Sequence, residues 1–366
     1  MLIQKIHIGG LLEFYESSAF KELPVIPISK NRVASYINNP RKIDKLPILY
    51  LYFDQSKLVG FRSILADTLK THGTTHPFGW FSGSWVHPDY RRLGIATLLL
   101  REVLKDWGFR MLFTNYAPAS KALYDKSSFF SLFEERKGLR LYFRFTLAEL
   151  LESKHLFFKK SKKVWGVLDS ILNGIFSPYY LWQKIRLRIH SPDVPVFDKL
   201  DESHYSFINK HSGSVFNRTQ PEYEWIFKYP WVKTVREETA EYPFSHVARQ
   251  FGYFVLTTQD PQNGIAGLAI GKIRDGHVTF PYLEVEEEYL KTMADQILKH
   301  AEQRRCTRLT VYHPKMVSYF QKKRGLGLLK KPMIQHYFIT KSFLSELPVL
   351  EHPLPLQDGD GDCVFT

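Results

Sequence analysis

The chain has 366 residues, with 50 lysines and arginines against 37 aspartates and glutamates, and its formal net charge is +13. The length suggests two domains, and 44% hydrophobic with 24% charged residues excludes a disordered, collagen-like or coiled-coil chain. Two cysteines, Cys306 and Cys363, are too few for a disulfide framework or a multi-cysteine zinc site. No signal-peptide pattern and no apolar run of the roughly 20 residues that a membrane span needs is present, so we expect a cytoplasmic protein.

Apolar runs and turn residues predict an α/β unit in the first half of the chain. Strands are expected over residues 47–53, 57–66 and 78–86, followed by an amphipathic helix over 92–107. A short strand over 111–115, a short helix over 118–126 and a last strand over 139–145 complete the unit. Antiparallel strands therefore lead into one central helix, and a strand, a helix and a strand follow it.

The stretch between the third strand and the central helix is the most informative part of the sequence. The strand ends at Val86, and the helix begins near Gly94. A helix N-terminus carries unpaired backbone amides and a partial positive charge, so it attracts anions. Gly94 and the small Ala96 leave that backbone open to a ligand, and Arg91 and Arg92 add charged donors. These residues suit a pyrophosphate, and the alternative is a helix that only happens to start with basic residues.

Arg91-x-x-Gly94-x-Ala96 resembles the acyl-CoA signature of the GCN5-related N-acetyltransferases (GNAT family), which is Arg/Gln-x-x-Gly-x-Gly/Ala. A second block, residues 115–126 (NYAPASKALYDK), is similar to the family's Asn…Ala…Leu-Tyr-x-Lys block. Its ending differs, since Ser127-Ser128-Phe129 stands where Gly-Phe is usual. The two motifs occur in the family's order, each on the expected element, and they predict a GNAT domain with an acetyl-CoA motif over residues 1–146.

The resemblance implies acetyl-CoA as co-substrate and a set of residues that hold it. They are Trp85, Val86, Arg91, Arg92, Leu93, Gly94, Ile95, Ala96, Asn115 and Tyr124. By the resemblance, the amides of residues 92–96 would hold the pyrophosphate, the strand edge at 85–86 would pair with the pantetheine, and Asn115 would contact it. Tyr124 would be the catalytic residue that protonates the leaving thiolate, and its alternative role is core packing.

The base that would deprotonate the acceptor amine is not identified by the sequence. An amine of pKa ~10 loses its proton at neutral pH at a cost of about 4 kcal/mol, so a base would help. The strand over 78–86 offers no carboxylate. Asp67, His76 and His87 are the nearest titratable residues, and each is expected at the surface.

The second half repeats the plan of the first without the cofactor motif. Strands are expected over 251–257, 264–273 and 278–285, then a helix over 287–304, a strand over 308–312, a helix over 314–323 and a strand over 333–340. Glu286-Glu287-Glu288 stands where the first half has its basic loop and would repel a pyrophosphate, and Phe320 replaces Tyr124. We therefore predict a degenerate GNAT-like domain over 192–343, as one wall of an acceptor cleft or as a structural repeat.

Residues 147–191 are predicted to be a basic amphipathic connector. Between residues 155 and 190 seven basic residues stand against Asp169 alone, with seven aromatic residues among them. A helix packed between the domains is the simpler interpretation. The alternative is an anionic partner: peripheral membrane contact through 155–190 stays open, as does an acidic polysaccharide, and nucleic acid is not expected.

Two further patterns carry alternative interpretations. In the predicted C-terminal tail, residues 344–366, Asp358-Gly359-Asp360-Gly361-Asp362 resembles the start of a calcium loop without its closing Glu, so we expect an exposed polar tail and no metal. Tyr223, Trp225 and Trp231 could stack on a sugar or a peptide, although a buried aromatic cluster is the simpler expectation.

The sequence thus predicts an α/β (α+β) fold of two GNAT-like acyl-CoA N-acyltransferase domains, each with a mixed, mostly antiparallel central sheet flanked by helices. The expected activity is transfer of an acetyl group from acetyl-CoA to the primary amine of an amino sugar, amino acid, glycan precursor or peptide. The amine would attack the thioester directly. The alternative is a non-catalytic binding protein on a vestigial GNAT fold, whose basic connector contacts an anionic partner. The oligomeric state is not specified by the sequence.

Overall fold

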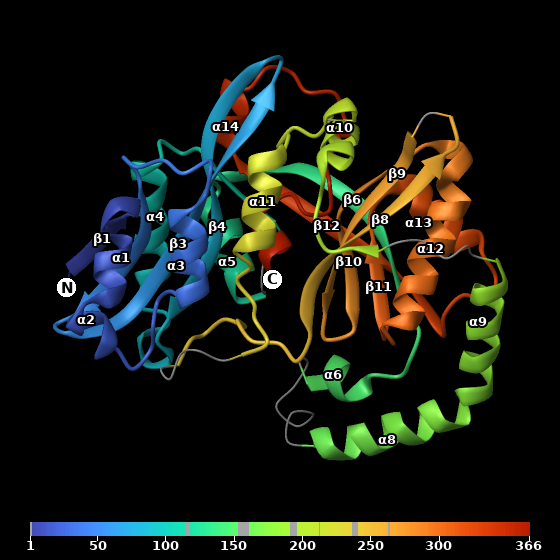
Figure 1. Cartoon of the computed structure of the whole chain (residues 1–366). Coiled ribbons are helices and arrows are strands. Elements are labelled where there is room, and N and C mark those ends of the chain that lie inside the picture. Colours follow the sequence, from blue (N-terminus) through green and yellow to red (C-terminus); the bar gives the residue numbers. More distant parts are fainter. Residues whose placement is uncertain are drawn as a thin grey trace. The chain divides into compact units, whose positions relative to one another are not determined.

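The computed structural model describes residues 2–114, 118–152, 161–190, 196–211, 213–235, 241–262 and 264–366 (Figure 1). Backbone contacts divide the chain into two compact units. Unit 1 comprises Met1–Arg136, Ile208–Phe251 and Gln335–Thr366, and unit 2 comprises Lys137–Phe207 and Gly252–Ile334. Each unit therefore combines segments that are far apart in the sequence.

Unit 1 is built on a sheet with the strand order β1-β2-β3-β4-β5-β12. The strands are β1 (Leu2–His7), β2 (Pro47–Asp54), β3 (Lys57–Thr71), β4 (Thr74–Val86), β5 (Met111–Thr114) and β12 (Leu329–Thr340), which belongs to unit 1 from Gln335 onward. Its helices are α1 (Ile8–Glu16), α2 (Ser18–Lys21), α3 (Lys30–Ile37), η1 (Pro88–Tyr90), α4 (Ile95–Asp106), α5 (Pro118–Ser127), α11 (Gln220–Lys228), α14 (Lys341–Glu346) and η3 (Asp362–Phe365). Neighbouring strands are antiparallel except β4 and β5, which are parallel.

Unit 2 contains the remaining strands of the sheet, in the order β6-β11-β10-β9-β8-β7. The strands are β6 (Phe130–Tyr142), which belongs to unit 2 from Lys137 onward, β7 (Val196–Phe197), β8 (Phe251–Asp260), β9 (Gly264–Arg274), β10 (His277–Val285) and β11 (Arg308–Val311). Its helices are α6 (Leu147–Glu152), α8 (Lys162–Ile175), α9 (Ser177–His190), η2 (Glu287–Tyr289), α12 (Leu290–Gln303) and α13 (Pro314–Lys322), while α10 (Glu202–Lys210) lies at the division between the units. Here too one pair, β10 and β11, is parallel.

Both units follow one plan, which confirms the predicted fold class. A strand, a short 3-10 helix, a long helix, a short strand and a second helix follow each other as β4-η1-α4-β5-α5 and as β10-η2-α12-β11-α13. The last strand of each repeat is exchanged, because β12 pairs with β5 and β6 pairs with β11. The predicted boundaries at 1–146, 147–191, 192–343 and 344–366 follow the sequence repeats and stay a prediction. The two compact units have other bounds because the last strands are exchanged.

The central helix α4 starts three residues later than the sequence predicts, and the backbone explains why. Arg92 and Gly94 have φ angles of +67° and +83°, in the left-handed region that interrupts a right-handed helix. From Ile95 onward the apolar side chains recur at helical spacing, and Ile95, Leu99 and Val103 are buried. The helix N-terminus is therefore fixed at Gly94, at the C-terminal end of β4.

A buried ionic cluster joins the segment Ile208–Phe251 to the rest of unit 1. The guanidinium of Arg41 lies 2.8 Å from Asp67 Oδ1 and 2.9 Å from Glu222 Oε1, with both carboxylates about nine-tenths buried. Arg41 also donates to the carbonyls of Phe216 and Asn217. Because all of these groups are paired, the cluster holds part of the second half of the sequence within the first unit.

Candidate active site

The sheet of unit 1 opens into a fork at the centre of the predicted site. β4 and β5 pair only at Gly79 with Met111 and Trp80 with Leu112, although β4 continues to Val86. Beyond that point the two parallel strands diverge. Aromatic side chains of both strands and of α5 fill the fork, with the ring of Tyr124 stacked on Phe113 at 4.3 Å between centroids.

The predicted pyrophosphate loop lies at the end of β4, with its backbone exposed. The first α-helical hydrogen bond of α4 is donated by Leu98 N to Gly94 O (3.0 Å), so the amides of residues 95–97 lie before it. Arg91, Arg92, Leu93 and Gly94 are exposed, Ile95 is buried and Ala96 is half-buried. A Cβ placed on Gly94 would meet no atom within 4 Å, so its positive φ, not its space, requires glycine. The loop has room for a bulky anion at a helix N-terminus.

Tyr124 on α5 lies where the fork opens. Its side chain is buried between Phe81 of β4 and Phe113 of β5, and Phe130 packs edge-on against it. Its hydroxyl accepts a hydrogen bond from Arg62 Nη1 at 3.2 Å. The ring of Tyr124 thus packs in the core and its hydroxyl faces a polar group, while its catalytic role stays a prediction.

Arg62 of β3 is the site residue that the sequence analysis missed. It is only 1% exposed, and its guanidinium donates to two neutral partners, Tyr124 and Ser84 Oγ (3.2 Å). Its Nε has no hydrogen-bond partner, and no carboxylate of the described residues pairs with it. A buried cation without a counterion costs several kcal/mol, so donor capacity beside Tyr124 is available for a ligand atom.

The other predicted cofactor residues are placed only in part. The Trp85 ring stacks on Phe61 at 5.5 Å, so its side chain is used in packing. Both Trp85 and Val86 pair with β3 through their backbones. Asn115 lies outside the described residues. Ser128, at the position where the family has glycine, has a φ of +55°, the left-handed conformation that favours glycine.

The three residues considered as bases make other contacts. The expectation that all three lie at the surface was wrong for Asp67. Asp67 is buried, not exposed, because it pairs with Arg41 and accepts a hydrogen bond from Trp80 Nε1 at 2.8 Å. His76 lies 3.0 Å from Thr71 Oγ1 near the tip of the β3–β4 hairpin. His87 caps η1 by accepting from the amide of Asp89.

A carboxylate does reach β4, from the C-terminal segment. Ser82 Oγ, one residue after Phe81, donates to Asp362 Oδ2 at 2.8 Å, and Arg32 Nη2 donates to Ser82 from the other side. A Cβ on Gly361 would lie 3.4 Å from Thr114 Cγ2 of β5. Asp362 is therefore held beside the fork, and sequence reasoning missed it because the partners are 280 residues apart.

The prediction of an exposed polar tail is wrong. Asp360 is 2% exposed and accepts from Ser214 Oγ, while Asp358 pairs with Arg136 at 2.8 Å. Arg218 donates to the carbonyls of Gly359 and Gly361. The segment docks because buried arginines satisfy its carboxylates and carbonyls. In the described part of the chain, no group of three or more metal-ligating side chains is found.

The aromatic residues of the α11 region belong to the same packing. Tyr223, Trp225 and Trp231 are all at least nine-tenths buried, and Trp231 stacks on Phe365 at 4.8 Å. Trp225 Nε1 donates to Ser35 O. They therefore form a buried cluster and leave no exposed ring for a sugar to stack on.

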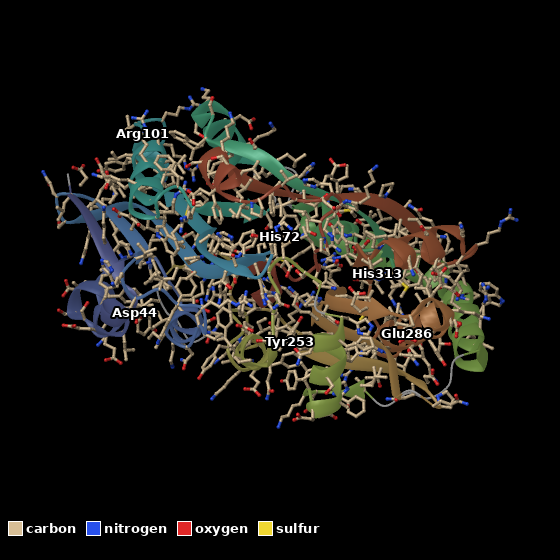
Figure 2. All side chains as sticks on the ribbon, turned by 90° about the horizontal axis from the view of Figure 1, so that it is seen from above. Asp44, His72, Arg101, Tyr253, Glu286 and His313 are labelled. Atoms are coloured by element: carbon tan, nitrogen blue, oxygen red, sulfur yellow. The ribbon has the colours of Figure 1, made fainter. Side chains whose placement is uncertain are left out.

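Unit 2 has different chemistry at the corresponding positions. Glu286, labelled in Figure 2, Glu287 and Glu288 are exposed at the end of β10, and Lys315 beside Glu287 lowers the pKa of that carboxyl. Phe320 is fully buried. A negative loop and a ring without a hydroxyl do not suit a pyrophosphate or a proton transfer to a thiolate.

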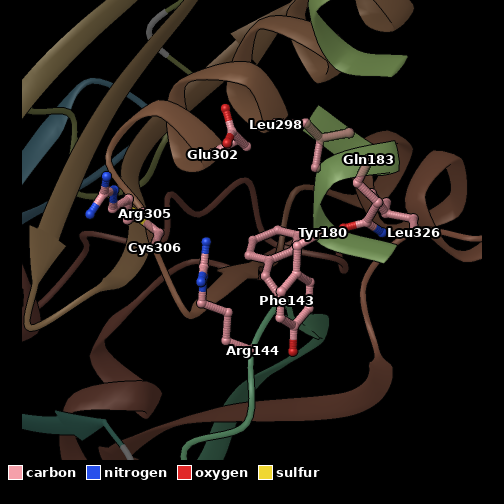
Figure 3. Close-up of a pocket in the computed structure, with 9 residues that line it drawn as sticks. All are labelled: Phe143, Arg144, Tyr180, Gln183, Leu298, Glu302, Arg305, Cys306 and Leu326. Atoms are coloured by element: carbon pink, nitrogen blue, oxygen red, sulfur yellow. The ribbon is translucent and has the colours of Figure 1, made fainter. Parts of the chain in front are cut away.

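Unit 2 contains a cavity of its own, shown in Figure 3. It is lined by Phe143, Arg144, Tyr180, Gln183, Leu298, Glu302, Arg305, Cys306 and Leu326. Burial raises the pKa of the Cys306 thiol to about 12, so this cysteine is not a nucleophile at neutral pH. The cavity shares no residue with the predicted cofactor site.

Comparison with solved structures finds distant similarities. Structures similar to this chain include a GCN5-related N-acetyltransferase from Kribbella flavida (13% identity, 92% of this chain and 71% of that one, TM-score 0.45). Others are a probable N-acyltransferase from Enterococcus faecalis V583 (9%, 92% and 71%, 0.48) and Saccharomyces cerevisiae N-myristoyltransferase with bound myristoylCoA (12%, 84% and 72%, 0.47). No residue role rests on these distant similarities.

A search of the curated proteins finds no match for this chain. In the described residues, no helix is long and apolar enough to cross a membrane. The model of the acetyltransferase (GNAT) family matches residues 14–129, which include β2 to β5, α4 and α5. Residues 14–129 therefore form a GNAT-family domain within this chain.

Proposed function

We propose that the protein is an acetyl-CoA-dependent N-acetyltransferase with one cofactor site, in unit 1, and a primary amine as acceptor. The observation that carries the proposal is the combination of an open helix N-terminus at Gly94 with a tyrosine hydroxyl in the β4–β5 fork. The helix N-terminus can hold a pyrophosphate, and the tyrosine hydroxyl can protonate a thiolate. Both lie in the domain that the family model matches.

The loop would hold the phosphates through its backbone and its arginines. The amides of residues 95–97 precede the first helical hydrogen bond, and Arg91 and Arg92 are exposed beside them. Charge-assisted hydrogen bonds of this kind contribute about 1.5–3 kcal/mol each. The cofactor supplies an activated acetyl thioester, and the diverging strands leave the edge of β4 available for its pantetheine.

In the proposed reaction the acceptor nitrogen attacks the thioester carbonyl carbon, a C–N bond forms and the C–S bond breaks. The Tyr124 hydroxyl gives its proton to the leaving sulfur. Arg62 donates a hydrogen bond to the Tyr124 oxygen, which stabilises the negative charge that develops there. Arg62 thereby acts as a positioning residue for Tyr124.

We propose that Asp362 is the base that takes up the proton of the attacking amine. Its carboxylate is bonded to Ser82 on β4, one residue from Phe81, which contacts Tyr124. A carboxylate at this place can take a proton directly or through one water molecule. The acceptor is then an amine that reaches the fork from the side of Asp362, and its identity is left to an acceptor screen.

The proposal is tested by following thiol release from acetyl-CoA over a panel of amino sugars, amino acids, polyamines and peptides. Tyr124→Phe should lower turnover by roughly 100-fold at unchanged acetyl-CoA affinity, in the range of general acid catalysis. Tyr319→Phe, which removes a hydroxyl from α13 in unit 2, is the matched control and should leave turnover unchanged. Equal turnover in Tyr124→Phe and wild type would exclude Tyr124 from the mechanism. Binding without any thiol release would favour the non-catalytic alternative.

A further inference from the structure

Helix α8 of unit 2 exposes an apolar stripe. Val164, Val167, Ile171 and Ile175 recur at intervals of three and four residues, so they share one face of the helix. Their exposed fractions are 66%, 60%, 55% and 66%. A stripe at this spacing ordinarily packs against a core, whereas here it is open to the surroundings of the chain.

The polar face of α8 is the one that holds the helix to unit 2. Asp169 is buried and accepts hydrogen bonds from the amides of Leu147 and Ala148, at the start of α6, at 2.7 and 2.9 Å. Asn173 bonds to both the amide and the carbonyl of Phe145, at 3.0 Å each. Two polar side chains therefore anchor the inner side of α8, while the four residues of the apolar stripe face outward.

Helix α9 follows α8 (Figure 1) and also exposes apolar side chains. Tyr179 OH and Gln183 Nε2 both donate to the carbonyl of Gly325, which fixes the inner side of the helix. Leu181, Trp182 and Ile185 are 58%, 49% and 50% exposed. Of the 18 large apolar residues that are exposed in the described chain, eight lie between Val164 and Ile185. Such a concentration marks an interaction surface.

The charge of this surface identifies its partner. Between residues 155 and 190 the sequence has seven basic residues, and its one acidic residue, Asp169, is buried against α6. Lys163 and Arg186 are exposed, and the Arg186 guanidinium lies 5.3 Å from the Trp182 ring. Apolar side chains, a tryptophan and basic side chains on one helix pair are the features of a helix that lies in a membrane interface.

We propose that α8 and α9 dock unit 2 onto an anionic lipid bilayer, with the apolar stripe among the headgroups. Basic residues near such a surface contribute about 1 kcal/mol each, and the buried apolar side chains add to this. Neither helix is long and apolar enough to cross the bilayer, so the helices would lie on it. This surface is separate from the predicted cofactor site and does not depend on the proposed reaction.

The test is co-sedimentation of the full chain with phosphatidylcholine vesicles, with and without about 30 mol% phosphatidylserine. We expect binding to the anionic vesicles, a loss of binding on raising the salt to about 0.5 M, and little binding to neutral vesicles. Trp182 should shift its fluorescence to shorter wavelength on binding, and Trp182→Phe should remove most of that shift.

Val167→Glu with Ile171→Glu should weaken vesicle binding by at least about tenfold, because two charges would enter the apolar interface. Val235→Glu with Val349→Glu is the matched control, since these valines are 67% and 91% exposed elsewhere in the chain. Both double variants should keep the wild-type circular dichroism and thermal unfolding. The stripe faces outward, so its substitution leaves the core intact.

Two results would overturn the proposal. One is wild-type protein that does not bind anionic vesicles, or that binds them as well after Val167→Glu with Ile171→Glu. The other is a dimer in sedimentation velocity that this double variant converts to a monomer, which would show that a second copy of the chain covers the stripe.

Discussion

The loops that follow β4 and β10 occupy the same place in the two units and have opposite charge. In unit 1, Arg91 and Arg92 precede a helix whose N-terminal glycine is open to its surroundings, whereas in unit 2 three exposed glutamates precede α12. Both loops contain a short 3-10 helix, so the fold tolerates either sequence. The difference therefore reflects what each loop binds and not what the fold requires.

The strand pairs that precede the two loops, β3–β4 and β9–β10, also differ in chemistry at matching positions. Gly60 pairs with Val86 and Arg62 with Ser84 in unit 1, and Gly267 with Val285 and Ala269 with Leu283 in unit 2. Unit 2 thus buries an apolar pair where unit 1 has a buried cation and a half-buried hydroxyl. Because the same sheet is stable with an apolar pair, the unpaired charge of Arg62 is unnecessary for folding and points to function.

The largest expected effect comes from giving unit 1 the charge of unit 2. Arg91→Glu with Arg92→Glu should weaken acetyl-CoA binding by about 100-fold or more, since two charge-assisted contacts are replaced by repulsion. The matched control is Lys322→Glu with Arg324→Glu, two exposed residues of unit 2 that give the same change in net charge. Calorimetry should find wild-type affinity in the control. An equal loss in both would mean that overall charge, not this loop, governs binding.

Removing the carboxylate of Asp362, which is bonded to Ser82, should lower the turnover rate and leave acetyl-CoA binding unchanged. Asp362→Asn should lower turnover by about 100-fold at neutral pH, within the range of general base catalysis, with acetyl-CoA affinity unchanged. Because the uncharged amide cannot take up a proton, the acidic limb of the pH–rate profile should also disappear. A variant that keeps both the rate and the profile would exclude Asp362 as the base.

Replacing the strand pair of unit 1 by an apolar pair should separate stability from activity. Arg62→Met with Ser84→Leu should lower turnover by about tenfold or more, while the melting temperature stays the same or rises, since buried charges are often replaced by apolar groups without loss. Thermal unfolding and thiol release measured on one preparation check both outcomes. A clear fall in melting temperature would indicate that Arg62 is structural.

The last two predictions concern the acid sensitivity of the units. Burial, reinforced by Arg304, lowers the pKa of His300 in unit 2 from its usual 6.5 to about 4. The unfolded chain then takes up a proton first, so stability is constant above pH 6.5 and falls by up to about 3 kcal/mol as the pH drops to 4. His300→Asn should flatten this fall in denaturant titrations. An unchanged slope would show that His300 does not cause it.

Unit 1 should lose stability at a lower pH than unit 2. Burial alone would raise the pKa of Glu222, but Arg41 and Thr219 lower it below its usual 4.5. Its contribution to stability is therefore present above pH 4.5 and is lost as the pH falls through the lower, folded-state pKa. Glu222→Gln should remove this step and leave the step of His300 in place.

The sequence was sufficient for features that depend on local pattern. Apolar runs and helical periodicity predicted β2, α4 and β10, whereas the role of the loop at Gly94 stays a prediction. The start of α4 was misplaced because the left-handed backbone of Arg92 has no sequence signature of its own. β6 was predicted to start nine residues too late, at 139 and not at Phe130, since its first half lacks a continuous apolar run.

Features that depend on distant parts of the chain could not be predicted. Asp362 reaches Ser82 only because the C-terminal segment folds back, and no local pattern encodes that path. Arg62 lies in a strand whose apolar run is typical of a buried strand, and one arginine within it gives no signal without its neighbour Tyr124. The periodicity of apolar residues likewise does not predict the exchange of β6 and β12.

The central claim is one acyl-CoA site per chain, at Gly94, and calorimetric titration of acetyl-CoA tests it most directly. Wild type should bind one equivalent, and Gly94→Trp should abolish binding because the indole would fill the phosphate position. Gly73→Trp is the matched control, since Gly73 has a φ of +81° and open space at the tip of a hairpin, and it should bind like wild type. Two equivalents per chain, or equal binding by Gly94→Trp, would contradict the account.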